Sequence, residues 1–125
     1  MVIHQSAEDY LESILALEEH LGHGQVHSID IVNRLGFSKP SVSIAMKKLR
    51  ENGYLVMAGD GAITLTDKGM EIASSVYDRH KTLTELFKRL GVSPGQAEVD
   101  ACKVEHDLSA ETYQKIVEFI ERNRT

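Results

Sequence analysis

The chain has 125 residues, of which 42% are hydrophobic and 26% charged, and its formal net charge is −5 at pH 7. This composition excludes a disordered chain, and no run approaches the ~18 consecutive apolar residues that a membrane helix needs. Acidic side chains interrupt the first 25 residues, so we expect no secretory signal. The sequence therefore predicts a cytoplasmic protein with no membrane partner.

Two short helices are predicted first. Residues 7–20 carry apolar side chains at helical spacing, with Ser6 as the expected N-cap. Residues 28–35 form a second apolar pattern of the same period, and Gly36 follows it directly. Glycine at this place ends a helix because it tolerates the left-handed backbone conformation.

A third helix is predicted after Ser38, an N-cap residue type, with Pro40 in the first turn and an end near Asn52. Two short helices joined by a tight turn that contains a glycine predict a helix-turn-helix. The apolar side chains expected to point inward from this third helix are Val42, Ile44, Ala45, Met46 and Leu49.

A β-hairpin is predicted next, because the mostly apolar stretches 54–57 and 62–65 flank a glycine-rich turn at 58–61. A helix-turn-helix followed by such a hairpin is a winged helix. Thr66 can cap the long apolar-patterned helix that follows, which is expected to end near Leu90.

Two more helices are predicted towards the end of the chain, over residues 93–106 and from Ser109 onwards. The fold class is therefore mainly α, an N-terminal winged helix-turn-helix with a small β-hairpin wing plus a C-terminal helical dimerisation domain. We place the domain boundary inside the long helix near residues 74–77. The expected domains are a DNA-binding domain, 1–73, and a metal-binding and dimerisation domain, 74–125.

Charge is distributed unevenly along the chain. Residues 31–50 hold five basic side chains and no acidic one, which leaves nine basic against 19 acidic residues elsewhere. A local positive stretch on an acidic body suits contact with DNA phosphates. The alternative is a winged helix whose exposed side chains contact protein instead. The residues expected to bind DNA are Ser38, Lys39, Pro40, Ser41, Ser43, Lys47, Lys48 and Arg50.

Several side chains are competent to bind a metal ion. Cys102, Glu105 and His106 lie at relative positions 0, +3 and +4, which would share one face if the stretch is helical. Asp9 and Glu12 lie three apart on the first predicted helix. Carboxylate, imidazole and thiolate together suit a divalent first-row ion, and the thiolate favours the softer ones. The candidate metal ligands are Asp9, Glu12, His80, Cys102, Glu105 and His106.

Five of the six candidate ligands have a structural alternative. Asp9 and Glu12 could stabilise the start of their helix through its dipole, His80 and Glu105 could be surface residues, and Cys102 could be a small core residue. Four further histidines near the N-terminus are expected to be solvated rather than metal-binding: His4, His20, His23 and His27.

The chain resembles the diphtheria-toxin-repressor and manganese-transport-regulator family of metal-dependent repressors, the iron-dependent repressor family. This resemblance implies a homodimer with a winged-helix domain, a helical dimerisation domain and a metal site at their junction. It extends over nearly the whole chain and is carried by residues 8–12 (EDYLE), 38–43 (SKPSVS), 65–69 (LTDKG), 79–80 (RH) and 101–109 (ACKVEHDLS).

The resemblance also bears on the metal. Five of the candidate ligands match the manganese-type pattern, but Cys102 matches the iron-type branch, whose members tend to have methionine at the place of Asp9. An ancillary site of that branch looks incomplete, because Thr84 and Glu98 occupy two of its positions. The SH3-like domain of longer relatives is expected to be absent. The expected cofactor is Fe²⁺ or Mn²⁺, with Zn²⁺ or Co²⁺ bound in vitro.

These observations predict a metal-dependent transcriptional repressor that binds double-stranded, palindromic operator DNA as a homodimer when loaded with Fe²⁺ or Mn²⁺. No enzymatic activity and no small organic ligand are expected. Two alternatives remain open at this point: a winged-helix regulator that senses redox state through Cys102, and a small metalloenzyme.

Overall fold

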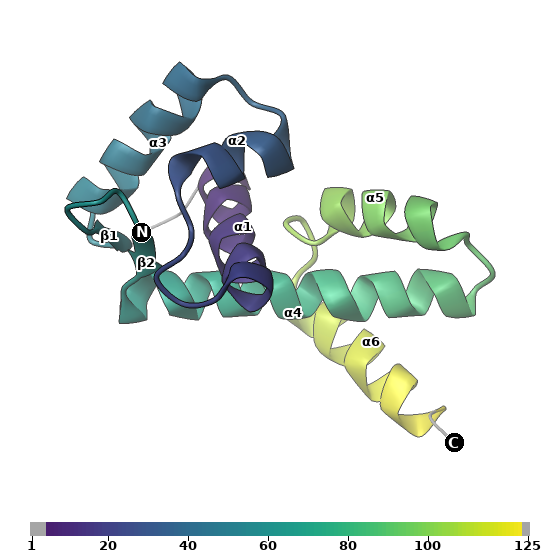
Figure 1. Ribbon diagram of the computed structural model, residues 1–125. Coiled ribbons are helices and arrows are strands. Elements are labelled where there is room, and N and C mark those ends of the chain that lie inside the picture. Colours follow the sequence, from purple (N-terminus) through teal and green to yellow (C-terminus); the bar gives the residue numbers. More distant parts are fainter. Residues whose placement is uncertain (1–4, 124–125) are drawn as a thin grey trace. The chain divides into compact units, whose positions relative to one another are not determined.

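The computed structural model describes residues 5–123 and confirms the mainly α class (Figure 1). The chain divides into two compact units, residues 1–75 and 76–125, and the division falls inside a long helix. His4 lies outside the described residues. Within 5–123 the elements are α1 Gln5–Leu21, α2 Ser28–Leu35, α3 Lys39–Glu51, β1 Leu55–Met57, β2 Ile63–Leu65, α4 Asp67–Arg89, α5 Pro94–Val104 and α6 Ala110–Arg122.

The first unit is the winged helix-turn-helix that the sequence predicts. Strands β1 and β2 pair antiparallel, with Val56 opposite Thr64, and the hairpin turn closes where the Ala62 N–H donates to Asp60 Oδ1 at 3.0 Å. Helices α1, α2 and α3 pack with the hairpin around one apolar core. The side chains that are fully or almost fully buried there include Leu11, Ile14, Val26, Ile31, Val42, Met46, Leu55 and Ile63.

Local signals fix the turn between α2 and α3. Gly36 adopts φ 73° and ψ 18°, a left-handed conformation, and its N–H donates to the Val32 carbonyl at 2.9 Å. Ser38 caps α3, because its Oγ accepts the Ser41 N–H at 3.2 Å. The predicted end of α2 and the predicted start of α3 are therefore confirmed.

Two predictions about the first unit are wrong. Ser6 is not an N-cap, because α1 already includes Gln5. Ile44 does not point inward: its side chain is 58% exposed, whereas Val42 and Met46 are buried. An α-helix turns about 100° per residue, so Ile44 lies about 200° around α3 from Val42 and falls on the opposite face.

The start of α4 is held against the hairpin by Thr66 and Gly69. Thr66 Oγ1 donates to the Gly53 carbonyl at 2.6 Å and accepts the Gly69 N–H at 3.2 Å, which confirms the predicted cap. A side chain at Gly69 would overlap the carbonyl oxygen of Tyr54. Glycine is therefore required there for close approach of two backbones.

The second unit consists of the later part of α4 with α5 and α6. Its buried apolar side chains include Leu83, Ala97 and Ile120. Ser109 caps α6 as predicted, because its Oγ accepts the Thr112 N–H at 3.1 Å. Among the residues that the structure describes, no helix is both long and apolar enough to span a bilayer.

Candidate metal centre and DNA-binding surface

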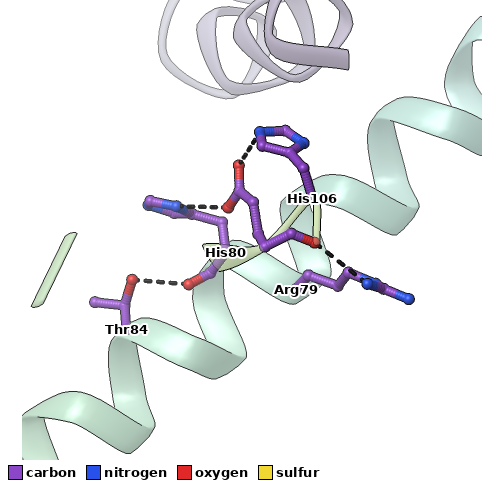
Figure 2. Close-up of polar contacts among 5 residues, drawn as sticks. Arg79, His80, Thr84 and His106 are labelled. Carbon is purple, nitrogen blue, oxygen red and sulfur yellow. Dashed lines mark hydrogen bonds and ion pairs between the residues drawn. The ribbon is translucent and has the colours of Figure 1, made fainter. Parts of the chain in front are cut away.

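A buried carboxylate joins two imidazoles in the second unit (Figure 2). Glu105 Oε2 lies 3.0 Å from His80 Nδ1, and Glu105 Oε1 lies 3.3 Å from His106 Nε2. The Glu105 side chain is 0% exposed, compared with 3% for His106 and 22% for His80. Burying a carboxylate is costly unless hydrogen bonds, an opposite charge or a metal ion compensate it. Three predicted ligands therefore converge on one point.

The neighbours of these residues hold them in place. The Arg79 guanidinium donates to the backbone carbonyls of Glu105 at 3.2 Å and Leu108 at 2.8 Å, and it lies 4.9 Å from the Tyr113 ring centre. The turn after α5 is thus fastened to α4 beside His80. Arg79 belongs to the motif of the resemblance, but its positioning role was not predicted, because its partners are backbone atoms.

Cys102 differs from the other donors in being exposed. Its sulfur lies within 4.8 Å of a Glu105 carboxylate oxygen, so the thiol can join the same donor group. The core alternative for Cys102 is therefore wrong. The helical geometry proposed for this motif is only partly right: α5 ends at Val104, two residues before the predicted end. Glu105 still has helical φ −56° and ψ −28°, but His106 lies in the following turn.

The first unit supplies the two remaining candidates, both from α1. Asp9 is half-buried, and Glu12 is only 8% exposed. The first turn of α1 contains Glu8 as its acidic residue, so Glu12 lies beyond the short range of the helix dipole. The dipole alternative therefore fails for Glu12. A buried carboxylate is costly unless an opposite charge or a metal ion compensates it, so the burial of Glu12 fits a metal ligand.

The donor set fits a divalent first-row ion in its chemistry. Glu105 offers carboxylate oxygens, His80 and His106 offer ring nitrogens, and Cys102 offers a sulfur within reach of Glu105. Imidazole and carboxylate suit Mn²⁺, Fe²⁺, Co²⁺ and Zn²⁺, and a thiolate favours the softer ions of this group. The hard ions Ca²⁺ and Mg²⁺ prefer sites of oxygen alone.

The N-terminal histidines differ from the candidate metal ligands in their surroundings. His20 and His23 are exposed and His27 is half-buried. His23 Nδ1 lies 3.8 Å from Glu18 Oε1, and the His23 side chain is exposed whereas that of Glu18 is only 11% exposed. Burial raises the pKa of Glu18, and the nearby His23 opposes that rise. Within residues 5–123 none of these histidines joins a group of three potential metal ligands.

Helix α3 presents polar and basic side chains to solvent. Ser38 and Ser41 bond to each other, with 2.9 Å between their hydroxyl oxygens, so Ser38 also has a structural role as the cap. Arg50 makes only a weak contact, 3.9 Å from Nη1 to the Met57 sulfur. The exposed residues of this surface are Ser38, Lys39, Pro40, Ser41, Ser43, Lys47, Lys48 and Arg50. Sequence reasoning missed one further exposed member, Ile44, although the helical period from Val42 indicates it.

Comparison with known proteins identifies both units. Residues 3–63 match the family described as iron dependent repressor, N-terminal DNA binding domain. Residues 66–125 match the family described as iron dependent repressor, metal binding and dimerisation domain. The chain belongs to the iron-dependent repressor family. The members of this family are metal-dependent transcriptional repressors, and the family resemblance of the sequence is therefore confirmed.

Two curated relatives match over most of their length. An uncharacterised HTH-type transcriptional regulator of Methanocaldococcus jannaschii is 36% identical over 120 residues, 94% of each chain. The transcriptional regulator MntR of Salmonella typhimurium is 32% identical over 118 residues, which is 94% of this chain and 74% of the relative. These relatives are transcriptional regulators, in line with the family.

Solved structures share the fold. IdeR of T. acidophilum superposes with a TM-score of 0.81 at 25% identity over 100% of this chain. A manganese-dependent transcriptional repressor in complex with manganese gives 0.80 at 29% identity over 92% of this chain. The chain spans 56% and 52% of these two structures, respectively.

Proposed function

We propose that this repressor is activated by a divalent ion bound by both units at once, from α1 and from residues 76–125. The main support is the buried Glu105 carboxylate between the imidazoles of His80 and His106. The buried carboxylate of Glu12 supports the contribution of α1. The proposed ligands are Asp9, Glu12, His80, Cys102, Glu105 and His106.

The residues act as a conformational switch in this proposal. A bound ion supplies positive charge that allows the carboxylates to share one centre. Through the ion, Asp9 and Glu12 then tie the proposed DNA-binding domain, 1–73, to the proposed metal-binding and dimerisation domain, 74–125. In a homodimer this tie sets the spacing of the two α3 helices, which must match half-sites about 34 Å apart on double-stranded operator DNA.

The switch needs only a modest coupling free energy between metal binding and DNA binding. A coupling of about 1–3 kcal/mol makes metal-loaded protein bind operator DNA about 5–150-fold more tightly than metal-free protein. The test is fluorescence anisotropy with a duplex selected from a random library, at fixed ionic strength, in Mn²⁺, in anaerobic Fe²⁺ and in chelator. Equal affinity for DNA in all three solutions would contradict activation by metal.

Cys102 is expected to bias the choice of metal. Replacement by glutamate, Cys102→Glu, exchanges a soft thiolate for a hard carboxylate, which shifts the preference from Fe²⁺ towards Mn²⁺ by about tenfold or more. Anaerobic competition titrations measure the ratio of the two affinities. Cys102→Ser is the control, because it removes the thiolate without adding a charge. An unchanged ratio in Cys102→Glu would show that the thiol does not set selectivity.

Lys47 is expected to contact a phosphate, because it is an exposed cation on α3. Lys47→Ala should lower the slope of log Kd against log salt concentration by about two, since the proposed homodimer loses one phosphate contact, worth about 0.9 in slope, in each of its two half-sites. The measurement is anisotropy at four or more salt concentrations. Lys115→Ala is the matched control, an exposed lysine of α6 that lies 3.6 Å from Glu118. Equal slopes for the Lys47→Ala and Lys115→Ala proteins would contradict the assignment.

A further inference from the structure

Ile44 is an exposed apolar side chain on α3, the helix that carries the proposed DNA-binding residues. It is 58% exposed, the largest exposed fraction among the exposed large apolar side chains that the structure describes in the first unit. Val42, Met46 and Leu49 hold the opposite side of α3 in the core. Pro40 lies four residues before Ile44 and is also exposed, so the two share a stripe along the helix.

The neighbours of Ile44 on this face are polar. Ser43 and Lys47 are exposed close to it, and they can bond to bases or phosphates. A single exposed isoleucine is ordinary on a protein surface. What distinguishes Ile44 is its place, because the early turns of a recognition helix are the part that meets base edges in the major groove.

The chemistry of the groove restricts what Ile44 can read. Its side chain has no hydrogen-bonding atom, so it cannot discriminate the donor and acceptor patterns of the bases. The apolar group that a base pair offers in the major groove is the C5-methyl group of thymine. Burial of one methyl-sized group against an aliphatic side chain is worth about a fourfold change in an equilibrium constant.

We propose that Ile44 is a specificity-determining residue that contacts a thymine C5-methyl group in each operator half-site, with Pro40 as its neighbour on the same stripe. This inference rests on the proposed DNA-binding function. It assigns an operator thymine to a residue that was expected to point inward but is exposed.

The test removes the methyl group alone. Metal-loaded protein is used to select a duplex from a random double-stranded library, and each thymine of that duplex is then replaced in turn by deoxyuridine. The wild-type protein should bind about fourfold more weakly when the contacted thymine of one half-site is replaced, and about 16-fold more weakly when the contacted thymines of both half-sites are replaced. Ile44→Ala should bind the thymine and deoxyuridine duplexes equally at that position, and Ile44→Val should retain part of the discrimination.

Ile29→Ala is the matched control, because Ile29 is 45% exposed but lies on α2. It should discriminate the two duplexes as the wild type does. The inference is overturned if no thymine replacement weakens wild-type binding, or if Ile44→Ala keeps the full discrimination. If no duplex is enriched and no salt-dependent DNA binding is seen, the proposed function fails together with it, which is a distinguishable result.

Discussion

A Glu105→Gln protein is expected to bind Mn²⁺ or Fe²⁺ about 100-fold more weakly than the wild type and to lose its metal-dependent binding to DNA. Loss of outer-shell partners already costs about 10–100-fold in metal affinity, and the proposal places Glu105 among the ligands themselves. Glutamine has nearly the same volume and keeps an oxygen acceptor for His80, so the fold should survive. Calorimetric titration with Mn²⁺ measures the affinity.

The control for this variant is Glu111→Gln, an exposed carboxylate in the first turn of α6. It makes the same chemical change away from the two imidazoles, so its Mn²⁺ affinity should equal that of the wild type. A folded Glu105→Gln protein with wild-type Mn²⁺ affinity would show that Glu105 serves the structure alone, through its contacts with His80 and His106.

Gly69→Ala is expected to lower the free energy of unfolding by about 1–3 kcal/mol or more, the range of overpacking changes. Alanine within a helix normally gains up to ~1 kcal/mol over glycine. Here the added Cβ would overlap the Tyr54 carbonyl oxygen. Backbone cannot rotate away as a flexible side chain can, so the overlap outweighs the gain. The midpoint of urea denaturation, followed by circular dichroism, measures the change.

Gly95→Ala is the matched control for the glycine at 69. Gly95 also lies within a helix, α5, but an added Cβ there would meet no atom within 4 Å. This variant should therefore be as stable as the wild type or more stable, by up to ~1 kcal/mol. If both alanine variants raise the midpoint of denaturation, the close approach of α4 to Tyr54 is not a constraint.

Much of the fold could be predicted because its signals are local. Gly36 and Ser38 each act through hydrogen bonds to residues within four positions, so the sequence alone placed the end of α2 and the start of α3. Ile44 was misplaced for a different reason. Five apolar residues of α3 were assigned inward, but they extend around more than half of the helix, and the strict period from Val42 puts Ile44 outside.

Only part of the candidate site could likewise be predicted from local sequence patterns. Spacing alone paired Asp9 with Glu12 and grouped Cys102 with Glu105. No spacing rule joins His80 to Glu105, which lie 25 residues apart in sequence, and only the family resemblance indicated this pairing. The end of α5 was also beyond local rules, because Glu105 keeps helical backbone angles and no glycine or proline marks the stop.

We propose that one ion is held by both units. The most direct measurement is an anomalous difference map from crystals of the protein loaded with Mn²⁺ under anaerobic conditions. The account predicts a peak at bonding distance, about 2.0–2.4 Å, from a carboxylate oxygen of Asp9 or Glu12 and from donor atoms of His80, Glu105 or His106. A peak bonded to residues of 76–125 alone, with both α1 carboxylates out of reach, would contradict it.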